Sequence, residues 1–343
     1  MKEEPGVDRE NVSAPLPWHV DAWDAVVRRR ATGRMPHALL ISGPAGLGKT
    51  DFGRALAKAV HCRQASGEAT ACGNCPECRQ FEAGSLPDWL ELGVPPKKKY
   101  IAVDQIRELG HWFSLTPAGG GGRIALIQPA ERMTTEAANS LLKTLEEPPP
   151  GSLLMLIADM PGRLPATVRS RCQQVQMKRP DRKTALEWLE QGPGVSDDWP
   201  ALLDLAGGSP LRAVRLREQG ALERARKGSR QLIDIANGRE SVIQVAADWV
   251  KQGLAESLQW WAVWLENLVR RGQAGAGHGG SLLEERAEDL QKLEARIDWK
   301  AVHELIAMIR AAERRLESAN AELLAESLLR QWVRANSTQA ENG

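Results

Sequence analysis

Short apolar runs alternate with helical periodicities in the first half of this 343-residue chain. This alternation is typical of a parallel α/β domain, in which strands that are covered on both faces are apolar throughout. The predicted strands cover residues 38–42, 89–92, 123–127, 153–158 and 173–177. Helices are predicted over 51–60 and over 136–147, where Leu141, Leu142 and Leu145 share one face and three prolines follow. We therefore expect an α/β domain at this end of the chain.

The pattern becomes wholly helical after residue 180. It is broken first by GGSP at residues 207–210 and again by the glycine-rich stretch 272–280, which we expect to be a surface loop. A flexible loop is also expected over residues 117–122. The length predicts two or three domains, so the helical part would fold apart from the α/β part.

A complete phosphate loop, GPAGLGKT, occupies residues 43–50 between a predicted strand and a predicted helix. In this setting the backbone N–H groups and the positive helix end converge on one phosphate site. The expected nucleotide-binding residues are Gly43, Gly46, Gly48, Lys49 and Thr50. Lys49 would neutralise the β- and γ-phosphates, and the Thr50 hydroxyl would bind magnesium. The sequence therefore predicts an ATP and Mg²⁺ site.

The strand that should supply the acids of such a site ends in Gln128 and Pro129. Hydrolysis requires a carboxylate for the metal and a group that orients water. An amide has no charge for the metal, and proline has no functional group. Glu131 is the nearest acid, and an alternative is that it replaces the lost base. We favour a site that does not hydrolyse ATP, and the sequence leaves open whether the loop binds nucleotide.

Four cysteines, Cys62, Cys72, Cys75 and Cys78, have the spacing C-x9-C-x2-C-x2-C. Overlapping C-x2-C turns let thiolates converge on one ion, and four thiolates indicate a structural zinc. Disulfides are the alternative, but we expect no signal peptide and a cytosolic chain, where thiols stay reduced. Cys172 stands alone and is expected to be a small buried hydrophobic residue.

Composition narrows the class of protein further. The net charge of +1 gives no global attraction to nucleic acid or to anionic lipid. Without an apolar run of membrane-spanning length, we expect a soluble, cytoplasmic protein. Tryptophan supplies 12 of the aromatic residues, and Trp260, Trp261 and Trp264 at helical spacing predict packing rather than ligand contacts.

These features together resemble the bacterial DNA polymerase III clamp loaders, a family of AAA+ proteins. The resemblance rests on HALL at 37–40, the phosphate loop, the four cysteines, PDW at 87–89, AANSLLKTLEEPP at 137–149 and SRC at 170–172. It is dense between residues 36 and 180. The altered strand end at Gln128 and the tail NAELLAESLL at 320–329 are similar to those of the delta prime subunits. One extra residue between Cys62 and Cys72 is a small departure from the pattern.

The resemblance implies a three-part AAA+ layout. Residues 1–178 would form the nucleotide-binding α/β domain with the zinc module, residues 179–218 a helical lid, and residues 219–343 a helical collar that closes a ring. The implied partners are the gamma or tau ATPase subunits and the delta subunit in a pentamer, the β sliding clamp, and primed DNA through the complex. The chain would thus have no ATPase activity by itself but belong to a DNA-directed DNA polymerase (nucleotidyltransferase) holoenzyme.

The resemblance also assigns roles to single arginines. Arg171 would be an arginine finger for a neighbouring gamma or tau subunit, although by itself it reads as a surface charge. Arg212 is similar to the sensor-2 arginine of active members, and the inserted Pro210 leaves its register open. The basic runs at 28–30 and 97–99 are expected to be solvated faces, with DNA contact as the alternative.

Two other functions compete with this interpretation. An active, gamma-like AAA+ ATPase of the same complex would need acids where Gln128 and Pro129 stand. A nucleic-acid-binding zinc module would be expected to carry excess basic charge and aromatic residues among the cysteines, which this chain lacks.

Overall fold

The computed structural model describes residues 15–64, 70–119, 122–192, 196–274, 286–316 and 320–337. The chain divides into two compact units, Met1–Thr184 and Ala185–Gly343. In the part that the structure describes, no helix combines the length and apolar composition needed to cross a bilayer.

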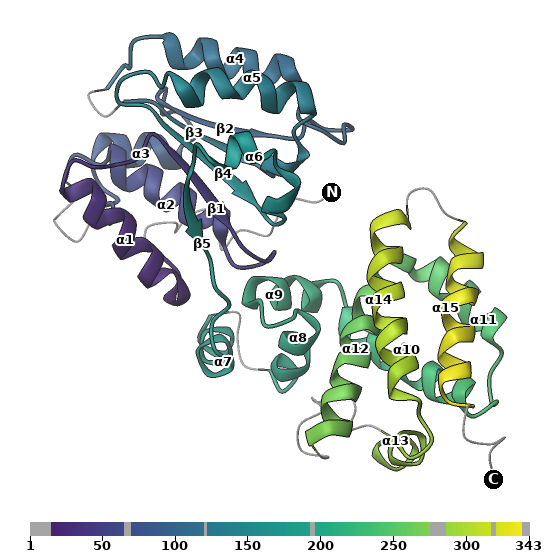
Figure 1. Cartoon of the computed structure of the whole chain (residues 1–343). Coiled ribbons are helices and arrows are strands. Elements are labelled where there is room, and N and C mark those ends of the chain that lie inside the picture. The colour runs from purple at the N-terminus through teal and green to yellow at the C-terminus, as the bar shows by residue number, and fades with distance from the viewer. Residues whose placement is uncertain are drawn as a thin grey trace. The chain divides into compact units, whose positions relative to one another are not determined.

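Five parallel strands form the sheet of the first unit in the order β2-β3-β4-β1-β5 (Figure 1). Their bounds are β1 Ala38–Ser42, β2 Trp89–Gly93, β3 Ile124–Gln128, β4 Leu153–Ala158 and β5 Gln173–Gln176. The five predicted strands are confirmed, and no end is displaced by more than one residue. In register, Leu40 of β1 pairs with Leu156 of β4 and with Gln174 of β5. The strand that precedes the phosphate loop is therefore flanked on both sides.

Helices cover both faces of this sheet (Figure 1). The helices of this unit are α1 Val20–Ala31, α2 Lys49–His61, α3 Pro76–Glu82, α4 Val103–Ser114, α5 Thr135–Glu146 and α6 Ala166–Arg169, with short 3-10 turns at Pro17–His19, Ala130–Arg132 and Pro161–Arg163. Trp23 of α1 and Phe52 of α2 are buried against one face, and Phe113 of α4 and Leu141 of α5 against the other. The predicted helices are thus α2 and α5, while α1, α3, α4 and α6 were not predicted.

The start of α5 shows why this helix forms where it does. The Thr134 hydroxyl accepts a hydrogen bond from the N–H of Ala137 at 3.2 Å, which satisfies one of the unpaired donors of the first turn. Leu141 and Leu145 are buried, as their spacing predicted, and the helix ends before the three prolines.

The second unit is helical and has one continuous hydrophobic core. Its helices are α7 Arg182–Gln191, whose first residues lie before the unit boundary, α8 Trp199–Leu205, α9 Pro210–Glu218, α10 Ala221–Ala236, α11 Val242–Gln252, α12 Leu254–Ala274, α13 Ala287–Glu294, α14 Trp299–Arg315 and α15 Ala321–Ala335. Trp260, Trp261 and Trp264 are buried in this core, so their predicted packing role is confirmed. The core also includes Trp199 of α8 and Trp332 of α15.

The glycine-rich breaks had different outcomes. The break at 207–210 is confirmed, because it separates α8 from α9. The prediction that a loop begins at Gly272 is wrong, since α12 continues to Ala274. A Cβ at Gly272 would lie 2.4 Å from Cη2 of Trp299, so the glycine permits close packing within a helix. Residues 275–280 of the predicted loop, and residues 120–121 of the loop predicted at 117–122, lie outside the described residues.

Candidate functional site

The phosphate loop follows β1 and leads directly into α2. Gly48 precedes the helix with φ of 73°, a conformation that favours glycine. A Cβ at Gly43 would lie 2.5 Å from the carbonyl oxygen of Met177, so the loop also passes close to the chain beyond β5. The sequence prediction of a strand, a glycine-rich turn and a helix is therefore confirmed in geometry. The helix N-terminus points at the position where a phosphate group would bind.

Lys49 of this loop is buried and already has two partners. Its Nζ donates to the carbonyl of Pro44 at 2.7 Å and lies 2.6 Å from Oδ1 of Asp159, directly after β4. Glu131 in turn accepts hydrogen bonds from the N–H groups of Asp159 and Met160, at 3.0 and 3.1 Å. The Glu131 carboxylate therefore fixes the turn that carries Asp159. Sequence reasoning missed Asp159 because only the sheet order brings the end of β4 beside the phosphate loop.

At the expected magnesium position, the Thr50 hydroxyl donates to the side-chain carbonyl of Gln128. The Gln128 amide donates to Oε1 of Glu91 at 2.6 Å, and the Arg54 guanidinium holds both oxygens of Glu91, at 2.7 and 3.0 Å. A neutral amide thus contacts the threonine where an ATPase would place a carboxylate for the metal. The nearest carboxylate in this hydrogen-bond network is that of Glu91, and its charge is neutralised by the Arg54 guanidinium.

Two aromatic side chains before α1 bind the carbonyl of Leu47 in the phosphate loop. Trp18 donates through Nε1 at 2.9 Å, and Nε2 of the buried His19 lies 2.7 Å from the same oxygen. The N–H of Leu16 donates to Nδ1 of His19 at 3.2 Å, so the ring fits as the neutral Nε2–H tautomer. Burial is the largest cause that lowers the pKa of His19 to about 4, and the Lys49 charge lowers it further. Sequence analysis did not single out either residue, since no motif marks them.

Arg171 follows α6 and has an exposed fraction of 36% for its side chain. One of its terminal nitrogens lies 2.6 Å from Glu146, the last residue of α5, and the other donates to the carbonyl of Thr167 at 2.9 Å. The guanidinium is therefore held in a defined position and remains accessible. Glu146 was not identified from the sequence as its partner.

The other basic residues singled out from the sequence lie elsewhere. Arg212 lies in α9 of the second unit and donates to Oε1 of Gln259 at 3.2 Å. Lys97, Lys98 and Lys99 are exposed in the loop between β2 and α4, next to Tyr100, which is also exposed. Arg30 donates to the carbonyls of Ala59 and Val60 at the end of α2.

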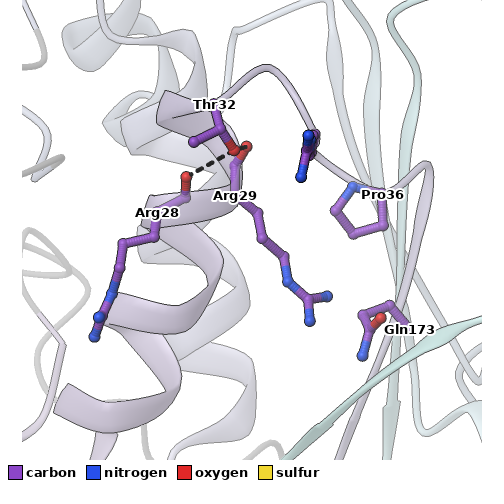
Figure 2. A pocket seen from close by; sticks show the side chains of 6 residues that line it. Arg28, Arg29, Thr32, Pro36 and Gln173 are labelled. Atoms are coloured by element: carbon purple, nitrogen blue, oxygen red, sulfur yellow. Dashed lines mark hydrogen bonds between the residues drawn. The ribbon is translucent and has the colours of Figure 1, made fainter.

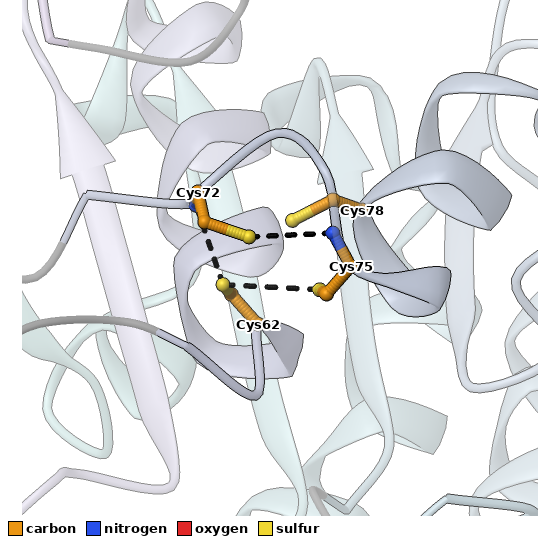
Figure 3. A group of neighbouring side chains, drawn as sticks. All are labelled: Cys62, Cys72, Cys75 and Cys78. Carbon is orange, nitrogen blue, oxygen red and sulfur yellow. Dashed lines mark hydrogen bonds between the residues drawn. The ribbon is translucent and has the colours of Figure 1, made fainter.

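The four cysteines Cys62, Cys72, Cys75 and Cys78 converge at the ends of two helices (Figure 3). Cys62 directly follows α2 and Cys75 directly precedes α3. Their four sulfur atoms all lie within 4.8 Å of one another, and those of Cys62 and Cys75 are 3.9 Å apart. A tetrahedral zinc with Zn–S bonds of about 2.3 Å requires sulfurs about 3.8 Å apart. The cluster therefore fits a zinc ion, whereas all five cysteines are free of disulfides.

The surroundings of these sulfurs also suit a metal. Backbone N–H groups of Asn74 and Cys75 donate to the Cys72 sulfur and lower the pKa of this thiol to about 6. Burial raises the pKa of Cys78 to about 12, so that thiol would release its proton when a metal binds. Cys172 is buried in the core beside α5 and α6, as predicted, away from the cluster.

The parallel sheet and the phosphate loop, with Gln128 at the end of β3 beside Thr50, define a P-loop α/β protein. Comparison with known proteins identifies the family. Residues 18–181 match the family profile described as DNA polymerase III, delta subunit. Residues 221–334 match the profile described as the C-terminal part of the DNA polymerase III delta subunit. The chain is 32% identical over 332 residues to DNA polymerase III subunit delta' of Pseudomonas aeruginosa, covering 92% of this chain and 97% of that protein. The chain belongs to the DNA polymerase III delta prime subunit family.

Other known proteins resemble this chain over a shorter length or in fold alone. DNA polymerase III subunit tau of Escherichia coli is 36% identical over 166 residues, which are 48% of this chain and 25% of that protein. A crystal structure of a gamma subunit-related protein from Thermotoga maritima aligns with a TM-score of 0.47 and 16% identity, covering 92% of this chain and all of that one.

Proposed function

We propose that this chain is the non-hydrolysing delta prime subunit of a bacterial clamp loader. In this complex it joins gamma or tau ATPase subunits and a delta subunit and helps to load the β sliding clamp onto primed DNA. Membership of the delta prime family and the similarity to a tau subunit support this role. The gamma-like alternative has less support, because Gln128 occupies the position of the metal-binding acid.

The observation that carries the proposal is the contrast between two sites. The chain's own phosphate loop lacks a carboxylate at Thr50, yet Arg171 presents an accessible guanidinium held by Glu146. A guanidinium delivered to another subunit's nucleotide stabilises charge developing on the γ-phosphate, typically by about 10³- to 10⁵-fold in rate. Arg171 is therefore the residue through which this chain would act on a neighbour's ATP.

The domain layout is part of the same proposal. Residues 1–178 form the nucleotide-binding domain with the zinc module, residues 179–218 the lid and residues 219–343 the collar. The helices α7 to α9 share a hydrophobic core with α10 to α15. We expect the lid and the collar of this subunit to move as one body, which suits a subunit that does not turn over ATP.

The structural zinc and the nucleotide are the cofactors of this proposal. Cys62, Cys72, Cys75 and Cys78 hold zinc, which fixes the ends of α2 and α3 and contributes to folding. ATP with Mg²⁺ would bind at Lys49 and Thr50 only by displacing Asp159 and Gln128 from them.

Replacing Arg171 by alanine in a complex reconstituted with gamma or tau, delta and the clamp tests the proposal. Arg169→Ala is the matched control, since it removes a neighbouring exposed arginine. We expect the complex to assemble with either variant, because an accessible guanidinium contributes little to a hydrophobic interface.

ATPase activity stimulated by DNA and clamp should fall only in part with Arg171→Ala, since other subunits keep their own arginines, and clamp loading should fall further. Equal activities of the Arg171→Ala and Arg169→Ala complexes in both assays, with assembly verified by native mass spectrometry, would refute the arginine-finger role.

A further inference from the structure

The arginine run at residues 28–30 is not one surface patch. Arg30 reaches across to the end of α2, where it donates to two backbone carbonyls and is half-buried. Arg28 and Arg29 are exposed at the end of α1, and the turn that follows brings the exposed Arg34 close to them. The N–H of Arg34 donates to the carbonyl of Arg29 at 2.8 Å, which fixes this turn.

These three exposed arginines line a hollow of about 470 Å³ (Figure 2). The lining is completed by Thr32, Pro36 and Gln173. Pro36 precedes β1 and Gln173 begins β5, so the hollow lies at the amino ends of these parallel strands. The phosphate loop follows the opposite, carboxyl end of β1, about 15 Å away along a five-residue strand. The hollow is therefore separate from the nucleotide site.

The charge in this hollow is almost uncompensated. Asp24 lies 4.0 Å from Arg28, one helical turn away, and both side chains are largely exposed to solvent. Within the described ranges, no carboxylate forms an ion pair with Arg29 or Arg34. The Thr32 hydroxyl donates its proton to the carbonyls of Arg28 and Arg29, so it adds neither a free donor nor a negative charge to the hollow. Arg29 extends toward the side of Pro36 and Gln173, whereas Arg28 extends from the same helix end in another direction (Figure 2). The exposed arginines therefore form one basic surface at and beside the hollow.

The lining selects among anionic ligands. Arginine forks match phosphate oxygens in bidentate geometry. The hollow contains no aromatic side chain on which a base could stack, and proline is its only apolar residue. A peptide or a nucleoside would find little to contact beyond its charge. A polymer that carries regularly spaced phosphate groups on its outer surface could bind several of these guanidinium groups at once.

We propose that Arg28, Arg29 and Arg34 form a binding site for the phosphate backbone of duplex DNA, independent of base sequence. The inference stands apart from the nucleotide site and from Arg171. Neutralised phosphates release condensed counterions, so the contribution of each arginine should appear in the salt dependence of binding.

The test measures fluorescence anisotropy of a labelled duplex with the full-length chain between 50 and 200 mM NaCl. A variant with Arg28→Ala, Arg29→Ala and Arg34→Ala should bind about tenfold or more weakly at the lowest salt. The slope of log K against log salt should fall by about 2 to 3, and equally for two unrelated sequences. Replacing the same three arginines by lysine should preserve most of the slope.

The control variant removes three exposed lysines of the second unit, Lys251→Ala, Lys292→Ala and Lys300→Ala. The same DNA affinity for the arginine-to-alanine variant and wild type, or an equal loss in the control, would overturn the proposal. If millimolar inorganic phosphate displaced the duplex completely, the hollow would be a simple anion site, and this result would also overturn the proposal. Preferential binding of a glutamate-rich peptide that depends on these arginines would make the hollow a protein-docking site instead.

Discussion

The ammonium group of Lys49 lies 2.6 Å from the carboxylate of Asp159, although 110 positions separate the two residues in the chain. The lysine is buried and Asp159 is partly exposed. An incoming phosphate would have to replace this carboxylate before it could bind the lysine. The Asp159 carboxylate thus already occupies the side of Lys49 at which a phosphate would bind. Glu131 holds Asp159 in place by accepting a hydrogen bond from its backbone N–H.

We expect Asp159→Asn to raise the affinity of the chain for ATP. The asparagine keeps the size of the side chain but removes the charge that competes with phosphate, and a tenfold gain would correspond to about 1.4 kcal/mol. Isothermal titration calorimetry with ATP, with and without Mg²⁺, measures this effect. Asp104→Asn is a control on an exposed carboxylate of α4. Unchanged or weaker ATP binding by Asp159→Asn would show that Asp159 does not compete with phosphate.

ATP turnover should remain absent in the isolated chain. Wild type and Asp159→Asn should hydrolyse ATP no faster than Lys49→Ala, because Gln128 cannot supply the charge that the metal requires. A sensitive phosphate-release assay on each purified protein measures the rates. Turnover in wild type that disappears with Lys49→Ala would restore a catalytic role to an acid such as Glu131.

Stability should fall as the pH is lowered from 6.5 toward 4, partly because of His19. The folded pKa of about 4 lies below the usual 6.5, so the unfolded chain binds the extra proton in this window. The neutral histidine therefore contributes full stability above pH 6.5, and this contribution decreases as the pH falls. Between pH 7.5 and 5.5 the loss should be about 1 kcal/mol.

Urea denaturation of wild type and His19→Gln at both pH values isolates this effect. The loss should be smaller in His19→Gln by about the same 1 kcal/mol. The pKa of His61 is also lowered by burial, so the stability of the His19→Gln variant should still depend on pH to some extent. The exposed His37→Gln serves as control. The same pH dependence in wild type and His19→Gln would contradict the buried neutral tautomer at Leu47.

The purified chain should contain one zinc ion, and Cys75→Ser should lose it. Structural zinc contributes to folding, so this variant should also unfold at a lower temperature. Cys172→Ser is the matched control, because it changes a buried thiol outside the cluster and should retain the metal. Elemental analysis of reduced, chelator-free protein measures the content. Metal-free wild type, or zinc retained by Cys75→Ser, would argue against the four-thiolate site.

Two glycine-to-alanine changes in helices should have opposite effects on stability. A Cβ at Gly228 of α10 would lie 2.0 Å from the Trp260 ring, so Gly228→Ala should destabilise the second unit by about 1–3 kcal/mol. At Gly110 of α4 the nearest atom would be 3.9 Å away, so Gly110→Ala should stabilise the first unit by about 0.5–1 kcal/mol. Thermal unfolding distinguishes them, and equal shifts would contradict the packing of Trp260.

The sequence by itself determined the elements that depend on local pattern. All five strands were predicted within one residue. The strands β1, β3 and β4 are buried and apolar along nearly their whole length, whereas β5 alternates exposed glutamines with the buried Val175. The phosphate loop and the cysteine cluster were also predicted, since a glycine turn before a helix and overlapping C-x2-C turns bring their ligand groups together over short spans. The absence of an acid at Gln128 was equally visible in the sequence.

Only the tertiary structure decided which side chains meet across those elements. Asp159, Glu91 and His19 come from separate segments, and the folded sheet brings them to the phosphate loop or to its neighbours. Gly272 was read as a break because its role as space for Trp299 depends on a helix elsewhere in the chain. Local sequence patterns predict which residues are buried and where the chain turns. Ion pairs and close packing between distant segments depend on positions that only the folded chain defines.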